Sequence, residues 1–119
     1  MIDYTSKQNL VLCSNQEFII KVDELQNQKI RYRCWRRPKT TMEDPDLILL
    51  NGSIRVFEPA DKMEFVFPFG ERTYVLEKIM PQNEQNTSHI FLEVSDDQNQ
   101  KTTWKLQDAV IPNQVDRLL

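Results

Sequence analysis

The stretch EFIIKVDELQNQKIRYRCWRR, residues 17–37, contains two runs in which apolar and polar side chains alternate. An alternation of this kind is typical of a strand that turns one face toward a core. The polar residues 26–28 separate the runs, and the asparagine among them suits a hairpin loop. The stretch therefore predicts two antiparallel strands. Their predicted core-facing residues are Phe18, Ile20 and Val22 in the first, and Ile30, Tyr32 and Cys34 in the second.

The same period of two continues along the chain, and no segment has the spacing of an amphipathic helix over three turns. The further alternating runs are residues 46–58, 63–70, 73–80, 88–94 and 102–107. Turn signals occur along the way, and Asn51-Gly52 is a strong one. We therefore predict an all-β fold, an antiparallel β-sandwich or small barrel of about seven to eight strands.

The alternation also predicts which side chains line the core, because every second residue of a strand shares one face. The predicted core consists of Leu12, Phe18, Ile20, Val22, Ile30, Tyr32, Leu47, Leu49, Ile54, Val56, Phe65, Phe67, Leu76, Ile90, Leu92, Val94, Trp104 and Leu106.

The bulk composition is that of one ordinary globular domain. The chain has 119 residues, of which 39% are hydrophobic and 28% charged, and we expect a single β domain over residues 1–119. A chain of this length can bury a core without help from a metal or a disulfide. No apolar run approaches the ~20 residues of a membrane span. The net charge of −3 argues against non-specific nucleic-acid binding.

Cys13 and Cys34 are the two cysteines of the chain, and a four-ligand zinc site is excluded because His89 is the sole histidine. Two interpretations stay open. In an oxidising compartment the cysteines form a disulfide, which closes a loop worth roughly 3 kcal/mol. In a reducing compartment they are unpaired thiols, of which Cys34 is buried.

No catalytic or cofactor motif is present, so we expect neither an enzyme nor a bound cofactor. Ser88 and His89 are adjacent, and adjacent residues of a strand point to opposite faces, which excludes them as a catalytic pair. The acidic residues 43–46 and the pair Asp96-Asp97 lack the ligand spacing and the glycine of a calcium loop. We therefore predict no metal site.

The stretch RYRCWRRPK, residues 31–39, combines five positive charges with two aromatic side chains. If Tyr32 and Cys34 face the core, then Arg31, Arg33 and Trp35 share the opposite face, where successive side chains lie about 7 Å apart. One interpretation is a solvated face with Asp23 or Glu24 as cross-strand partners. The other is a partner-binding surface, because an exposed indole leaves apolar area in water at ~25 cal/mol per Å². The candidate binding residues are Arg31, Arg33, Trp35, Arg36, Arg37 and Lys39.

The run from Tyr32 to Gly52 resembles a segment of small, uncharacterised secreted or lipid-anchored proteins of Bacteroides-like bacteria. Those proteins carry a Tyr-Arg-x-x-Trp strand, a loop, and then Pro-Asp-Leu-x-Leu-x-Asn-Gly. The matching positions here are Tyr32, Arg33, Trp35, Pro45, Asp46, Leu47, Leu49, Asn51 and Gly52. The chain departs from the pattern at Arg36-Arg37 and lacks the usual glycine-rich stretch. The resemblance implies a β-rich protein outside the cytoplasm and no known activity.

These observations favour a non-enzymatic binding protein that engages a partner protein with an acidic surface. An immunity protein or an enzyme inhibitor is the most specific form of this hypothesis. The first alternative is a carbohydrate-binding module, in which Trp35, together with Trp104 or Tyr74, stacks on sugar rings. A nucleic-acid-binding domain is the second alternative. We expect a periplasmic or extracellular location. Residues 1–10 show no signal peptide, so this expectation assumes that one has been removed. A cytoplasmic location stays open.

Overall fold

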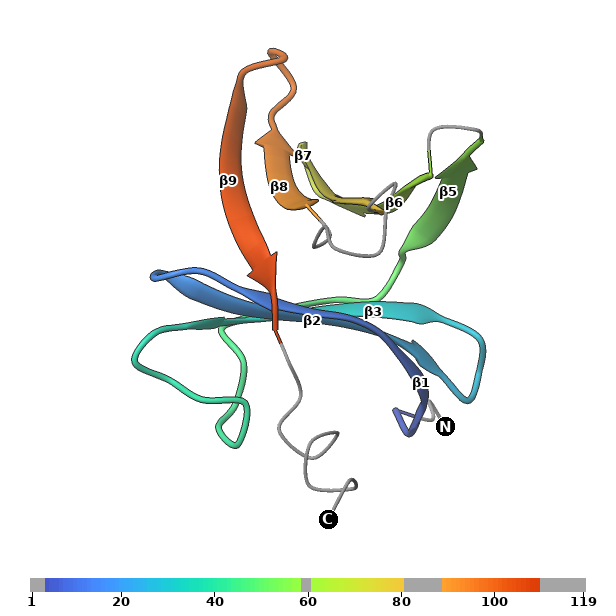
Figure 1. Cartoon of the computed structure of the whole chain (residues 1–119), viewed down its shortest axis with the longest axis vertical. Helices are drawn as coiled ribbons and strands as arrows, with labels where there is room; N and C mark the ends of the chain where they lie inside the picture. The colour runs from blue at the N-terminus through green and yellow to red at the C-terminus, as the bar shows by residue number, and fades with distance from the viewer. Residues whose placement is uncertain (1–3, 59–60, 81–88, 110–119) are drawn as a thin grey trace.

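The computed structural model describes residues 4–58, 61–80 and 89–109, and these residues form nine strands and no helix (Figure 1). The all-β antiparallel prediction is confirmed, and the expected seven to eight strands are too few. The strands are β1 (Ser6–Ser14), β2 (Phe18–Leu25), β3 (Ile30–Arg36), β4 (Leu47–Leu49), β5 (Ser53–Phe57), β6 (Lys62–Phe69), β7 (Arg72–Ile79), β8 (His89–Ser95) and β9 (Lys101–Asp108).

All nine strands belong to one curled sheet, a half-barrel with the order β4-β3-β2-β1-β9-β8-β7-β6-β5. The architecture is thus neither a two-sheet sandwich nor a closed barrel, because the edge strands β4 and β5 do not pair with each other. The three residues 50–52 connect these opposite edges, so Asn51-Gly52 is not the turn of a hairpin. A Cβ at Gly52 would overlap the ring of Phe67, so only glycine fits at this point of the connection.

Strands β1–β4 form one half of the sheet and β5–β9 the other, which we call the N-terminal and C-terminal halves. They are joined by β1 and β9, whose short pairing matches Cys13 with Asp108 and Ser14 with Gln107. In Figure 1, β9 rises steeply from the layer formed by β1, β2 and β3. The sheet therefore bends sharply at this junction and encloses the core between its two halves.

The core lies on the inner face of both halves. Tyr32 of β3 spans the interior, with its ring centroid 5.4 Å from that of Phe67 and 5.9 Å from that of Tyr74. The predicted core residues that are buried are Phe18, Ile20, Val22, Tyr32, Leu49, Phe65, Phe67, Leu76, Ile90, Leu92 and Leu106. Those that are half-buried against this core are Ile30, Leu47, Val94 and Trp104.

The core prediction is wrong at three positions. In β1, Val11 and Cys13 are the buried residues, so Leu12 between them faces the opposite side. The pairing of β1 with β2 shifts register twice, which obscures the alternation in this strand. Ile54 and Val56 do lie on the inner face, opposite Phe65 and Met63. They remain 39% and 58% exposed because β5 is an edge strand that no further layer covers.

The two cysteines are buried free thiols in this structure, which corresponds to the second of the two interpretations left open by the sequence. Cys13 and Cys34 both pair with Ile20, one from each side. Two strand spacings separate them by about 10 Å, beyond the ~7 Å between Cα atoms that a disulfide can span. Burial, followed by the negative charge of Asp108, raises the pKa of Cys13 to about 12. Burial also raises the pKa of Cys34, so neither thiol is a reactive nucleophile at neutral pH.

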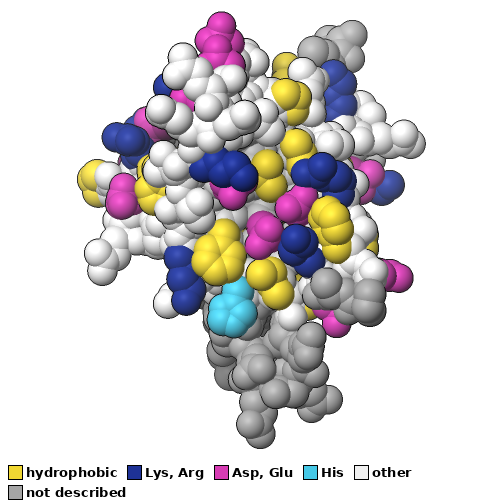
Figure 2. All heavy atoms as spheres, turned by 90° about the horizontal axis from the view of Figure 1, so that it is seen from above, with side chains coloured by type: hydrophobic (Ala, Val, Ile, Leu, Met, Phe, Trp, Pro, Cys, Tyr) yellow, Lys and Arg dark blue, Asp and Glu magenta, His cyan; other side chains and the backbone are white. Residues whose placement is uncertain are grey.

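The outer face of the C-terminal half carries charges of both signs beside hydrophobic side chains (Figure 2). Arg55 Nη2 lies 2.7 Å from Glu64 Oε1, and Lys62 Nζ lies 3.7 Å from Glu77 Oε2. Lys62 Nζ also lies 4.5 Å from the centroid of the Phe57 ring. This face is a solvated surface of cross-strand pairs.

Candidate functional site

The basic stretch 31–39 follows the predicted alternation, but its tryptophan is not exposed. Tyr32 and Cys34 are buried on the inner face, and Trp35 points to the outer face as predicted. There the connection between β3 and β4, residues 37–46, covers it, and its indole Nε1 donates to the backbone oxygen of Glu43 at 2.8 Å. Trp35 is only 1% exposed, so the expectation of an exposed indole is wrong.

Arg31 and Arg33 are held by a buried carboxylate. Asp23 is fully buried and accepts from Arg31 through both oxygens, at 3.0 Å from Nε and 2.7 Å from Nη2. Arg33 Nη2 lies 3.5 Å from the same carboxylate. Burial by itself raises the pKa of Asp23, but hydrogen bonds from Arg31 and Ser6 outweigh it and lower the pKa below its usual value. The cross-strand partner that the alternative interpretation named is therefore present.

This cluster on the outer face of the N-terminal half carries more positive than negative charge. Lys21 lies directly opposite Arg33 in the pairing of β2 with β3. Burial, and then the charge of Arg33, lowers the pKa of Lys21. Arg33 has its Cζ 5.4 Å from the centroid of the Trp35 ring, and its buried Nε has no hydrogen-bond partner in the described part of the chain. Arg33 is thus fixed in place by packing as much as by its ion pair.

Lys39 and Arg36 secure the connection that covers Trp35. Lys39 Nζ donates to Asp46 Oδ1 at 2.9 Å, and the backbone nitrogen of Arg36 donates to Asp46 Oδ2 at 2.7 Å. The hydrogen bonds from Arg36 and then Lys39 lower the pKa of Asp46. The guanidinium of Arg36 is exposed, with its Cζ 5.9 Å from the centroid of the Phe18 ring. Lys39 pairs with Asp46, whereas the guanidinium of Arg36 pairs with no carboxylate among the described residues.

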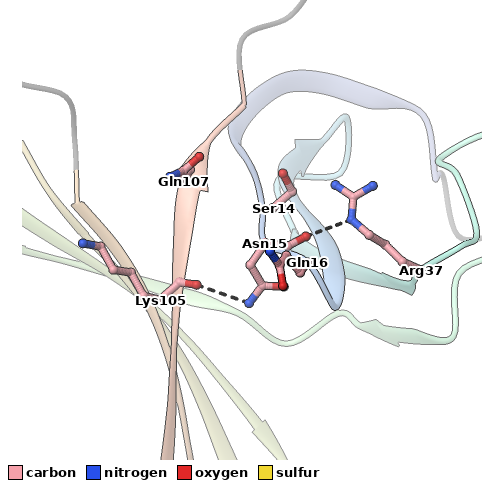
Figure 3. Close-up of a pocket in the computed structure, with 6 residues that line it drawn as sticks. All are labelled: Ser14, Asn15, Gln16, Arg37, Lys105 and Gln107. Atoms are coloured by element: carbon pink, nitrogen blue, oxygen red, sulfur yellow. Dashed lines mark hydrogen bonds between the residues drawn. The ribbon is translucent and has the colours of Figure 1, made fainter.

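Arg37 lies in an open pocket at the outer corner where the β1–β2 turn meets β9 (Figure 3). We call this the corner pocket; its volume is about 460 Å³. Its lining residues are Ser14, Asn15, Gln16, Arg37, Lys105 and Gln107. The lining that the structure describes thus contains two cations and no carboxylate. The rest of it consists of hydroxyl and amide groups, which suit a polar, negatively charged ligand.

Asn15 holds the walls of the corner pocket together. Its backbone oxygen accepts from Arg37 Nε at 2.8 Å, and its Nδ2 donates to the backbone oxygen of Lys105 at 3.2 Å. Its Oδ1 accepts from the backbone nitrogens of Glu17 and Phe18, both at 2.8 Å. Asn15 therefore lies between Arg37 and β9 and links the two (Figure 3).

The structure divides the six predicted binding residues into two groups. Arg31, Arg33, Trp35 and Lys39 have intramolecular partners that occupy them, as described above. Arg36 and Arg37 have donors without a described partner, and of these two Arg37 lines the corner pocket. Sequence reasoning missed Asn15 and Lys105, and no local signal could have found them, because they meet only where β1 pairs with β9.

No family model, no curated protein and no solved structure matches the chain. The described residues hold no cluster of histidine, cysteine and carboxylate side chains that could bind a metal ion. Within the same residues, no helix is long and apolar enough to cross a membrane.

Proposed function

We propose that this protein is a non-enzymatic binding protein that engages an acidic partner protein through the corner pocket. The observation that carries the proposal is the state of Arg37. Its Nε donates to the Asn15 carbonyl, while its remaining donors have no described partner and lie in a pocket whose described lining includes Lys105 and no carboxylate.

A guanidinium held in this way suits recognition of carboxylates. The planar fork of arginine matches the two oxygens of an aspartate or glutamate. Because Asn15 already orients the group, binding a partner costs less side-chain entropy than it would for a free arginine. An acidic surface over the pocket would also complement its two cations, Arg37 and Lys105.

The proposal narrows the alternatives that the sequence left open. The carbohydrate-binding alternative depended on sugar stacking by an exposed Trp35, and burial of the indole removes that support. A role as an immunity protein or inhibitor outside the cytoplasm remains the most specific form of the proposal. It is supported by the resemblance over residues 32–52.

The test measures binding of a fluorescent oligo-glutamate peptide by anisotropy, with an oligo-lysine peptide and a single-stranded DNA as comparison probes. We expect the glutamate peptide to bind, and both Arg37→Gln and Lys105→Gln to weaken it about tenfold. Lys101→Gln is the matched control, because Lys101 lies on the same strand but pairs with Glu93. Equal binding by all four proteins would refute the corner pocket. DNA binding with the same dependence on Arg37 would refute a protein partner.

A further inference from the structure

The free edge of β5 is a second candidate binding surface of this protein. β5 pairs with β6 along one side, and none of the other described strands pairs with its second side. Every residue of Ser53–Phe57 is exposed. An unpaired edge presents backbone donors and acceptors, which natural proteins usually block with prolines, charges or a very short strand.

The two edges of the sheet differ in how they are protected. β4 has three residues and follows Pro45, so it offers little backbone to a partner. β5 has five residues and no proline, and its inner-face residues Ile54 and Val56 are apolar and uncovered. β-branched residues of this kind favour pairing with a further strand. Of the two edge strands, β5 is therefore the one that suits pairing with a further strand.

The positive charge of Arg55 on β5 indicates which side chain an added strand would carry opposite it. Arg55 lies on the outer face and is 58% exposed, with Nη2 bound to Glu64 on the side of β6. Its other donors have no partner in the described chain, and an acidic side chain directly opposite Arg55 on an added strand would meet them. The residues opposite Ile54 and Val56 would continue the inner face, where apolar side chains are buried.

The curl of the sheet argues for a single segment over a second copy of this chain. Antiparallel pairing of two β5 edges needs a two-fold axis perpendicular to the sheet, which turns both concave faces to the same side. The N-terminal halves of both copies would then lie on the same side of the joined edges. The connection 50–52 also ties the start of β5 to the N-terminal half, where the Gly52 nitrogen lies 3.4 Å from the Ile30 oxygen. A single extended strand needs less room beside the β5 edge than a second copy of the whole sheet.

We propose that the β5 edge binds an extended segment of a partner protein by strand addition, with an acidic residue between two apolar ones. This mode derives affinity from backbone hydrogen bonds and specificity from alternate side chains. The proposal does not depend on the corner pocket, since β5 is an edge strand and the pocket lies at the junction of β1 with β9, in the middle of the strand order.

The experiment uses two labelled peptides that contain Val-Glu-Val or Val-Lys-Val within the same polar flanks, with anisotropy as the readout. We expect the full chain to bind the glutamate peptide at least about fivefold more tightly. Arg55→Glu should reverse this preference. Val56→Lys should weaken both peptides about tenfold, because an inward charge blocks the edge. Ile48→Lys on β4 is the matched control and should change neither.

Three outcomes would overturn the proposal. The first is equal affinity for both peptides, and the second is an unchanged preference in Arg55→Glu. The third is a dimer in light scattering that Val56→Lys dissociates, which would assign the edge to a second copy. Because Val56 and Arg55 are each more than half exposed, the variants should fold, and circular dichroism checks this.

Discussion

The two halves of the sheet are built from the same alternating pattern, yet only the N-terminal half buries side chains on both faces. There the outer face holds Trp35 beneath a covering connection and Asp23 beneath two arginines. In the C-terminal half the outer face carries exposed ion pairs, such as Lys101 with Glu93. An outer-face position therefore matters for stability where a loop or a buried charge covers it, and little elsewhere.

The largest expected effect tests the covered face. Trp35→Ala should lower the free energy of unfolding by about 4 kcal/mol, because it empties a fully buried site and leaves the Glu43 carbonyl without its donor. Phe57→Ala, at an exposed outer-face aromatic of β5, should cost less than about 1.5 kcal/mol. Urea denaturation followed by circular dichroism measures both. Equal losses would show that the two outer faces do not differ.

The second effect concerns the buried carboxylate. Asp23→Asn leaves Arg31 and Arg33 without their counter-charge in a buried setting, so we expect a loss of about 3 kcal/mol. Glu93→Gln removes the carboxylate from the exposed pair with Lys101 and serves as the control. A small loss in Asp23→Asn would mean that the arginines find water or another acceptor at little cost.

The same carboxylate predicts a pH dependence. The pKa of Asp23 is lowered in the folded protein. Its contribution is therefore complete above the pKa of a free aspartate, about 4, and is lost as the pH falls through the lower folded value. Wild-type stability should fall more steeply below about pH 4 than that of Asp23→Asn. Parallel curves for the two proteins would contradict the lowered pKa.

An intermediate effect tests the link between the halves. Gly52→Ala places a Cβ against the ring of Phe67, which is fully buried and cannot move aside easily. We expect a loss of about 2 kcal/mol from overpacking. Gly70→Ala is a useful comparison of another kind, because nothing crowds a Cβ there and its cost comes from a φ of +61°. Restoration of Gly52→Ala by Phe67→Leu would identify the clash as the cause.

The smallest effect is expected on the exposed face. Glu93→Gln should change the free energy of unfolding by less than about 0.5 kcal/mol, since surface ion pairs contribute little. Raising the salt concentration should remove even this difference. A loss comparable to that of Asp23→Asn would mean that the outer face of the C-terminal half is covered too.

Alternation predicted the strands and the direction of their side chains well, because that information is local. Phe65, Leu76 and Ile90 are buried where the pattern placed them, and Trp35 faces outward as expected. Whether an outward residue is covered depends on a connection such as 37–46, whose path the pattern does not contain. The strand order was equally inaccessible, since Asn51-Gly52 has the residues of a hairpin turn and connects two sheet edges instead.

The candidate site was predicted only in part for the same reason. Arg37 was named from its basic neighbours, whereas Asn15 and Lys105 lie far from it in sequence. Asn15 contacts both of them near the junction of β1 with β9. The predicted role of Trp35 was wrong because exposure was inferred from the facing direction. A polar Asn-Gln-Glu turn before a strand carries no sign that it positions an arginine.

The meeting of β1 with β9 has a consequence for how the chain folds. Every other pairing in the sheet joins strands that are consecutive in sequence, so hairpins can form early with little loop-closure entropy. The closing contact joins the first strand to the last, which raises the contact order and slows the final step. On a ribosome that step must wait for β9 to emerge. Until then, β1 presents an unpaired strand edge that a chaperone could shield.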